Sequence, residues 1–406
     1  MLDSEEHNLS TWNDDWAWLV GDEGRSTLAD VAAQTTPLDL ATLQQLRRNI
    51  GPARTRLVVQ QVEWRHKAGR KFANPSSMWF TEKGLEQASD EWIAGYKAER
   101  FAGCQQAADL CCGIGGDAMA ICRMVPNVMA LDIDPLHSKL AELNSQGRTH
   151  VCQQDVTTFD VAQVDAWHMD PDRRTVAQAN RTVSLYHFSP ALEVIDRLLT
   201  MNANAAIKLA PATVVPDHWT AVAQLEWIGR KRECLQLVAW FGSLRHESAS
   251  RWATLVDDAG KAISFAGDPH EQVDLADSPG AFIYEPHATV LASSLSGAMA
   301  AKFQLQRLIP GGGYVTGNQA VTHPLLSAFE VMECLAYREK DVRQLLKKRR
   351  IGRLEVKKRS VEIDPNQLQN ACRNFGDEAA TLIVYRRQKK RMAVLAKRIV
   401  AASFEP

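Results

Sequence analysis

A glycine-rich segment, DLCCGIGGD, occupies residues 109–117. The short apolar run 107–112 leads into its glycines, and residues 117–124 follow at helical spacing. A glycine turn between a strand and a helix lets a ligand approach the backbone, which side chains would otherwise block. The segment therefore predicts the first strand, turn and helix of an α/β domain. Because the same glycine spacing also fits a dinucleotide-binding fingerprint, it does not by itself identify the ligand.

Strand-like and helix-like runs alternate after this turn. We expect strands at 128–131, 150–153, 164–169 and 204–209, helices at 135–144 and 190–200, and an antiparallel strand pair at 224–228 and 234–241. Such alternation is typical of a parallel sheet with helices on both faces. The expected fold class is α/β: a doubly wound, mainly parallel, seven-stranded Rossmann-like sheet.

The length of 406 residues suits two or three domains, at roughly 150 residues each. Changes in composition and in predicted secondary structure divide the chain into four parts. They are an N-terminal helical module (1–103), the sheet domain (104–245), a connecting region with a β-hairpin and helices (246–330), and a small basic α+β domain (331–406).

Acidic residues stand at the ends of three successive predicted strands. Asp109, Asp132 and Asp155 close them, and Asp117 lies in the first helical turn after the glycines. Ligands of open α/β sheets bind at the carboxyl ends of the strands, so these acids would face one crevice. Carboxylates beside the turn suit a ligand with an ammonium and a sulfonium group better than a pyrophosphate. S-adenosylmethionine is such a ligand.

Each acid has an assigned role in this prediction. Asp132 would accept the ribose hydroxyls, and Asp155 would meet the adenine amino group. An aspartate at a strand end also commonly caps the next helix, and this alternative stays open for each. The candidate cofactor-binding residues are Asp109, Cys111, Gly113, Gly115, Asp117, Asp132, Ile133, Asp155 and Val156.

Together with Asp170-Pro171, these residues resemble the class I S-adenosylmethionine-dependent methyltransferases over residues 104–242. Three stretches resemble, more narrowly, a bacterial and archaeal group of methyltransferases with a THUMP-like C-terminal domain. They are WFT at 79–81 with LEQ at 85–87, DPDRR at 170–174, and IGRLEVKKR at 351–359. The resemblance implies S-adenosylmethionine as cofactor and RNA as substrate, with a base nitrogen such as guanine N2 as the target.

Asp170 and Pro171 are the candidate catalytic residues. A carboxylate that accepts an N–H hydrogen bond would help an exocyclic amine attack the methyl group. The alternative is that Asp170 only holds the Pro171 turn. The chain departs from the pattern of many amino-group methyltransferases here, because Asp172 and Arg173 stand where a second proline and an aromatic residue are usual. A second departure is Cys111, at the position of the first glycine of the turn.

Positive charge is concentrated near the C-terminal end. Residues 331–406 hold 19 Lys and Arg against 9 Asp and Glu, while the whole chain has a net charge of -1. This asymmetry indicates a polyanionic partner, RNA first, held by phosphate contacts; the alternative is a solvated basic surface without a ligand. The candidate substrate-binding residues are Arg173, Arg174, Lys357, Lys358 and Arg359.

Composition excludes several classes of protein. No apolar run approaches the ~20 residues that cross a bilayer, so we expect no membrane partner. None of the eight cysteines forms a C-x-x-C pair, which predicts no metal site and reduced thiols in a cytoplasmic protein. Three functions remain: an RNA methyltransferase, a nucleic-acid or partner-binding protein that binds the cofactor without turnover, and a small-molecule methyltransferase. The sequence predicts no oligomeric state.

Overall fold

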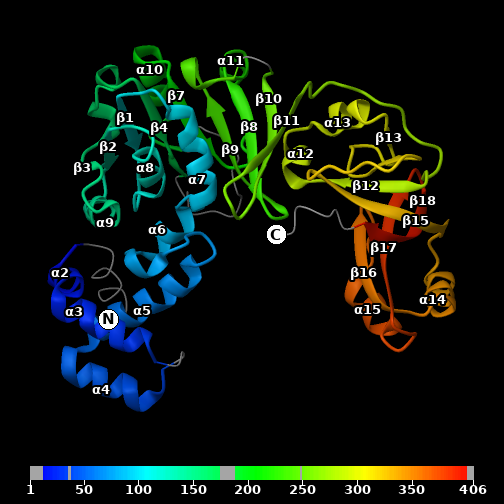
Figure 1. Ribbon diagram of the computed structural model, residues 1–406, viewed down its shortest axis with the longest axis horizontal. Coiled ribbons are helices and arrows are strands. Elements are labelled where there is room, and N and C mark those ends of the chain that lie inside the picture. Colours follow the sequence, from blue (N-terminus) through cyan, green and yellow to red (C-terminus); the bar gives the residue numbers. More distant parts are fainter. Residues whose placement is uncertain (1–11, 35–37, 174–187, 247–248, 400–406) are drawn as a thin grey trace. The chain divides into compact units, whose positions relative to one another are not determined.

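The computed structural model describes residues 12–34, 38–173, 188–246 and 249–399 (Figure 1). The chain forms two compact units. The first comprises Met1–Ala223 and Val238–Arg245, and the second comprises Gln224–Leu237 and His246–Pro406. The four-part domain division stays a prediction.

The first unit begins with a group of helices. Their bounds are α2 (Asp14–Val20), α3 (Asp22–Ala32), α4 (Leu40–Ile50), α5 (Pro52–Ala68), α6 (Glu82–Gln87) and α7 (Glu91–Ala98). Local sequence explains their limits, since Asn13 and Asp39 cap α2 and α4, and Gly51 ends α4 at a φ of 84°. Trp16, Leu57 and Phe80 lie in one hydrophobic core with Ile114 of the glycine turn. The helical group is therefore packed against the loop that carries the candidate site.

A sheet follows in the first unit. Its strands there are β1 (Gln106–Leu110), β2 (Asn127–Asp132), β3 (His150–Gln153), β4 (Ala166–Met169) and β7 (Ala205–Leu209). β1 lies between β2 and β4, and each neighbouring pair in the series β3-β2-β1-β4-β7 is parallel. The accompanying helices are α8 (Gly116–Ile121), α9 (Pro135–Ser145), α10 (Leu192–Met201) and α11 (Asp217–Thr220). In Figure 1, α9 packs beside β2 and β3, and α7 packs on α8.

The prediction of seven strands is wrong, because this sheet has nine, in the order β11-β10-β8-β9-β7-β4-β1-β2-β3. The further strands are β8 (Gln224–Arg230), β9 (Glu233–Trp240), β10 (Arg251–Val256) and β11 (Ala262–Gly267). The expected hairpin of the connecting region is β10–β11, and β10 joins the sheet by parallel pairing with β8. Its residues 253–256 are buried, so their backbone groups require partners that a solvent-exposed hairpin would lack. The sheet is mixed.

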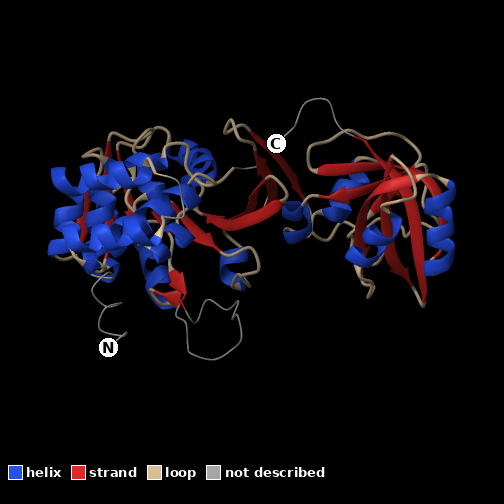
Figure 2. Ribbon diagram, turned by 90° about the horizontal axis from the view of Figure 1, so that it is seen from below, coloured by secondary structure: helices blue, strands red, loops and turns tan. Residues whose placement is uncertain are grey.

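The second unit contains a seven-stranded sheet of order β13-β14-β12-β15-β18-β17-β16 and consists mainly of strands (Figure 2). The strands are β12 (Phe282–Pro286), β13 (Gln306–Arg307), β14 (Val315–Gly317), β15 (Leu326–Ala336), β16 (Ile351–Arg359), β17 (Glu378–Arg387) and β18 (Lys390–Ile399). The helices are α12 (Ala288–Ala292), α13 (Ser296–Lys302), α14 (Glu339–Lys348) and α15 (Pro365–Cys372).

Two short strands of the first unit, β5 (Asp172–Arg173) and β6 (Phe188–Ser189), pair with each other outside both large sheets. Within the described residues, no helix is both long and apolar enough to cross a membrane.

Candidate functional site

The glycine turn between β1 and α8 has a left-handed backbone. Cys111, Gly113 and Gly115 have φ angles of 59°, 55° and 86°. A side chain at Gly115 would crowd α9, because its Cβ would lie 3.2 Å from the Ala141 Cβ. A Cβ at Gly113 would meet nothing within 4 Å. The turn therefore uses glycine at 113 for backbone conformation and leaves the space before it open.

Asp132, the last residue of β2, holds this turn. Its Oδ2 accepts a hydrogen bond from the Gly113 N–H at 2.8 Å, and its Oδ1 accepts one from the Asp134 N–H at 2.9 Å. Next to it, Ile133 is 67% exposed. Asp134 caps α9, as its position before Pro135 predicts. Asp132 and Ile133 thus border the open side of the turn.

Asp155, after β3, has the capping role that the sequence left open as its alternative. Its Oδ1 accepts a hydrogen bond from the Thr157 N–H at 2.9 Å, at the start of the short helix Val156–Thr158. Asp155 is exposed and Val156 is buried. Their contact with an adenine ring stays a prediction.

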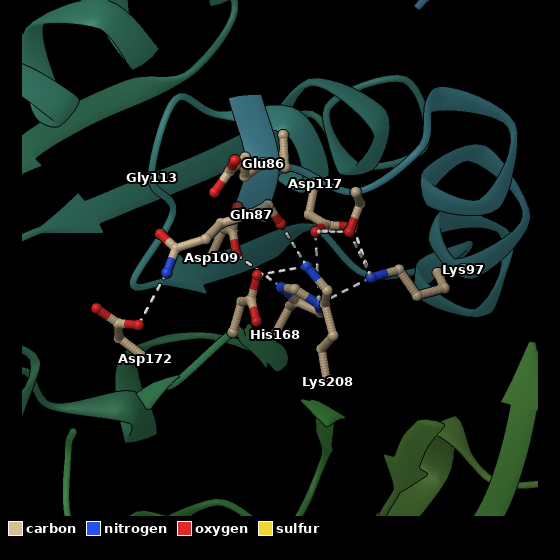
Figure 3. Close-up of polar contacts among 12 residues, drawn as sticks. Glu86, Gln87, Lys97, Asp109, Gly113, Asp117, His168, Asp172 and Lys208 are labelled. Atoms are coloured by element: carbon tan, nitrogen blue, oxygen red, sulfur yellow. Dashed lines mark hydrogen bonds and ion pairs between the residues drawn. The ribbon is translucent and has the colours of Figure 1, made fainter. Parts of the chain in front are cut away.

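Buried ionisable side chains surround Asp109, near the end of β1 (Figure 3). The Asp109 Oδ1 is 2.7 Å from the Nδ1 of His168 on β4. The Nε2 of that imidazole is 3.2 Å from the ammonium of Lys97 on α7. Lys97 in turn lies 2.7 Å from the Asp117 Oδ1. The side chains of Asp109, His168 and Lys97 are at most 2% exposed.

The pKa values of the two acids in this cluster, Asp109 and Asp117, are shifted in opposite directions. Burial raises the pKa of Asp109 above its ordinary value, more than the hydrogen bond from His168 lowers it. Burial also acts to raise the pKa of Asp117, but the charge of Lys97 outweighs it and holds that pKa well below its ordinary value. Asp117 is therefore ionised, and its Oδ2 accepts a further hydrogen bond from the Ser89 hydroxyl at 2.6 Å.

Asp170 follows β4 at the same edge of the sheet. Its Oδ2 is 2.5 Å from the ammonium of Lys208 on β7, and its side chain is 31% exposed. Burial alone lowers the pKa of Lys208, but Asp170 and Asp117 outweigh this and raise that pKa. Lys208 also donates to the Gln87 carbonyl oxygen at 2.9 Å. Asp170 is thus an anion held by a charged lysine, with part of its surface open.

The end of α6 lies against the segment that begins at Asp170. The Gln87 side chain donates to the Asp172 Oδ1 at 2.8 Å, and Lys83 is 2.7 Å from the Asp172 Oδ2. The Lys71 ammonium donates to the carbonyl oxygens of Leu85, Glu86 and Ala88, which fixes this end of the helix. The stretch LEQ, part of the family resemblance, therefore lies beside Asp172.

The donor set and the open space fit S-adenosylmethionine. The Asp109 Oδ2 is buried and has no hydrogen-bond partner, so it can accept from the ligand's ammonium. The space before Gly113 admits a ligand at the backbone, and Asp132 offers its carboxylate beside it. No cluster of three or more potential metal-ligating side chains occurs in the part of the chain that the structure describes. A depression of about 580 Å³ near Arg100, Asp165 and Asn204 lies at the opposite, amino end of the strands.

Three of the predicted substrate-binding residues lie on β16 and have partners within the second unit. Lys357 lies 2.6 Å from Glu285, and Arg359 lies 4.0 Å from the same carboxylate. The Lys358 ammonium donates to the Ile363 carbonyl oxygen at 2.9 Å. The backbone of Arg173 is part of β5, and Arg174 lies outside the described residues. Their roles stay predictions.

Sequence reasoning missed Lys97, His168 and Lys208. Two of them carry a signal, because His168 and Lys208 are ionisable residues inside apolar strand runs, AWHM and AAIKL. Such residues are rarely buried without a partner. Lys97 lies on a helix at 71 residues' distance from His168, and no local pattern marks it.

Known proteins resemble the chain in sequence and in fold. A THUMP domain-like family matches residues 326–398, and a family described as a domain of unknown function matches residues 13–68. Over 321 residues the chain is 28% identical to an S-adenosylmethionine-dependent methyltransferase of Mycobacterium tuberculosis described as uncharacterized. That alignment covers 76% of this chain and 85% of the relative, and the same match occurs in a second strain.

The structure also superposes on that of a protein from Porphyromonas gingivalis W83 assigned as a methyltransferase. The TM-score is 0.74 at 17% identity, covering 93% of this chain and 99% of the other, which shows a shared fold. Together these matches confirm two sequence predictions: the likeness to S-adenosylmethionine-dependent methyltransferases, and the THUMP-like domain near the C-terminal end.

Proposed function

We propose that this homologue of S-adenosylmethionine-dependent methyltransferases transfers the methyl group of S-adenosylmethionine to a base nitrogen of RNA, guanine N2 being one such target. The observation that carries the proposal is the edge of the sheet, where a buried orphan oxygen of Asp109, the open turn at Gly113 and the partly exposed Asp170 occur together. The 28% identical relative supports the cofactor.

In this proposal the chain's own residues divide the work of binding. Asp109 and Asp132 hold the ammonium and the ribose hydroxyls, and Ile133 contacts the adenine ring. The glycine turn allows close approach of the backbone. S-adenosylmethionine supplies a methyl group on a sulfonium, which is a leaving group that needs no further activation. The protein's main contribution is then alignment, which is worth roughly 7–11 kcal/mol in well-oriented reactions.

Asp170 is the residue proposed to act on the amine. As nitrogen attacks the methyl group, its N–H becomes more acidic, and a carboxylate that accepts this hydrogen bond stabilises the developing positive charge. One such preorganised partner is worth about 3–4 kcal/mol. Lys208 forms an ion pair with the Oδ2 of Asp170, which leaves the other oxygen for the substrate.

RNA as substrate rests on the THUMP-like domain and its charge. Lys357, Arg359 and Arg398 pair with Glu285 or Glu355, so their charges are largely compensated within the fold. The turn between β17 and β18 instead presents exposed Arg386, Lys389 and Lys390. We therefore assign the phosphate contacts first to this turn, which we call the basic turn (386–391).

The test is calorimetry with S-adenosylmethionine, followed by transfer of tritiated methyl groups to cellular RNA, protein and small-molecule fractions. We expect binding of the cofactor and label in RNA. Asp170→Asn should bind the cofactor and lose transfer about 100-fold to 1,000-fold. Asp160→Asn, at an exposed helix cap, is the matched control and should keep full transfer.

Other outcomes favour the alternatives. Cofactor binding with no labelled fraction indicates a binding protein without turnover, which the Asp170–Lys208 ion pair favours because it already occupies one carboxylate oxygen. Label in small molecules alone indicates a small-molecule methyltransferase. No cofactor binding refutes the proposed function.

The basic turn is tested by RNA affinity. This affinity should fall steeply with added salt, and the double variant Lys389→Glu, Lys390→Glu should weaken it more than Lys357→Gln does.

A further inference from the structure

Lys97 is a buried cation whose hydrogen bonds are all directed to acceptors inside the protein. Its ammonium lies 2.7 Å from the Asp117 Oδ1, 3.5 Å from the Ser89 hydroxyl and 3.2 Å from the His168 Nε2. An ammonium has three N–H groups and no acceptor, so the third one donates to a nitrogen lone pair. The His168 Nε2 therefore carries no proton.

This contact fixes the state of the imidazole. With Nε2 as acceptor, the single ring proton is on Nδ1, which donates to the Asp109 Oδ1 at 2.7 Å. His168 is then neutral, and it orients Asp109 without cancelling its charge. The Asp109 Oδ2 is left buried and without a partner.

The charges that face Asp109 do not balance. Lys97 from α7 compensates Asp117 from α8, and Lys208 from β7 compensates Asp170. Burial and the nearby acids raise the pKa values of the Cys111 and Cys112 thiols, which are therefore neutral. Among these groups, an ionised Asp109 beside a neutral His168 leaves one negative charge without a cation. Asp132, which is also buried, is held by two backbone N–H groups instead. A buried charge like that of Asp109 is costly unless a cation approaches it.

We propose that Lys97 is a positioning residue for the cofactor: by keeping His168 in its neutral Nδ1–H form, it reserves the Asp109 carboxylate for the cofactor's ammonium. This inference rests on the proposed function for the identity of the cofactor. It assigns a role to the predicted helical module, since α7 supplies the residue that sets the charge around Asp109.

The inference predicts linked proton release. Without ligand, the raised pKa of Asp109 favours uptake of a proton as the pH falls. An ammonium bound at Oδ2 favours the ionised form, so binding releases that proton to solvent and strengthens as the pH rises.

The test compares the wild type with the double variant Lys97→Met, Asp117→Asn. This pair of changes removes one cation together with its anion, so no unpaired charge is left inside the protein. The remaining consequence is that His168 is free to take a second proton and neutralise Asp109. The probes are S-adenosylhomocysteine, which keeps the ammonium, and 5′-methylthioadenosine, which lacks it. Lys139→Met, on an exposed ion pair of α9, is the control.

At about pH 6 the double variant should bind S-adenosylhomocysteine roughly tenfold to a hundredfold more weakly than the wild type. The loss should disappear at about pH 8.5, well above the range in which imidazoles ordinarily bind a second proton. Binding of 5′-methylthioadenosine should be unchanged at both pH values, and Lys139→Met should bind both probes normally. The imidazole nitrogen-15 shifts, assigned with His168→Gln, should report an Nδ1–H neutral ring in the wild type and a protonated ring at the lower pH in the double variant.

An equal loss for both probes, a loss that persists at the higher pH, or an unchanged affinity would overturn the inference. A protonated His168 in the wild type would also overturn it. If the wild type binds neither probe, the proposed function fails first, and the nitrogen-15 shifts still decide the state of His168.

Discussion

Replacing Asn144 by leucine should separate the helical module from the glycine turn. Asn144 lies on α9 and is 3% exposed. Its Oδ1 accepts a hydrogen bond from the Trp79 N–H at 2.8 Å, and its Nδ2 donates to the carbonyl oxygens of Trp79 at 3.1 Å and Ile114 at 3.0 Å. One amide side chain thus binds the WFT segment to the residue between Gly113 and Gly115.

The magnitude follows from the three backbone groups that lose their partner. Each buried backbone group without a partner costs about 1–3 kcal/mol, so the three together cost about 3–9 kcal/mol. Leucine recovers about 1–2 kcal/mol by burying apolar surface, so the net destabilisation is roughly 1–8 kcal/mol. The carbonyl of Ile114 is freed at the same time. We therefore expect the cofactor affinity to fall as well, because the glycine turn loses its anchor on α9.

The assay is urea unfolding followed by tryptophan fluorescence, with calorimetric titration of S-adenosylmethionine on the same samples. Asn127→Leu is the matched control, since Asn127 is exposed on β2 and its side chain donates one hydrogen bond, to the Gln105 carbonyl oxygen. The control should unfold within about 0.5 kcal/mol of the wild type. If Asn144→Leu unfolds together with the control, the three hydrogen bonds do not hold these segments together and the reasoning is refuted.

Three further predictions concern the same unit and the THUMP-like domain. Gly115→Ala should destabilise by about 2–3 kcal/mol, through its left-handed φ and the contact with Ala141, whereas Gly147→Ala, with a φ of 75° and open space, should lose only about 1–2 kcal/mol; urea midpoints compare them. The folded-state pKa of Asp117 is lowered, so the ionised Asp117 stabilises the fold fully above the unfolded pKa of about 3.9 and loses this contribution as the pH falls below it. A plot of the urea unfolding midpoint against pH in the acid range should therefore be flatter for the Lys97→Met, Asp117→Asn variant than for the wild type. An equally steep curve would contradict the ion pair. Lys357→Gln should destabilise the THUMP-like domain slightly, by less than about 1 kcal/mol, without changing RNA affinity in a filter-binding assay, and a large loss of affinity would reassign the phosphate contacts to β16.

The sequence predicted the local parts of the site well. The strand, glycine turn and helix at 106–121 and the strand-end positions of Asp109 and Asp132 depend on neighbours along the chain, and each occurs as expected. The number of strands was not predictable in the same way. The strand β10 lies between β11 and β8 in the sheet. Its residue Trp252 pairs with Glu226 of β8, 26 positions earlier, and an apolar run does not specify which strand it pairs with.

The charged residues were likewise predictable only in part from the sequence. The excess of Lys and Arg after residue 330 is visible by counting, but counting does not pair Lys357 with Glu285, 72 residues earlier. Likewise Lys97, His168 and Lys208 come from α7, β4 and β7, and only folding brings their partners together. Sequence reasoning finds acids at strand ends and misses the bases that compensate them.

The four acids near the glycine turn differ in whether a neighbouring group compensates their charge. This difference decides which ligand the turn can accept. Asp117 and Asp170 are paired with lysines, and Asp132 is satisfied by two backbone N–H groups. Asp109 alone, among these four acids, keeps an oxygen that is both buried and without a partner. A pyrophosphate at this turn would add negative charge beside an interior that already has an excess of it, whereas an ammonium removes the imbalance. The glycine spacing shared with dinucleotide-binding folds therefore describes how the backbone bends, and the charge behind it selects a cationic ligand.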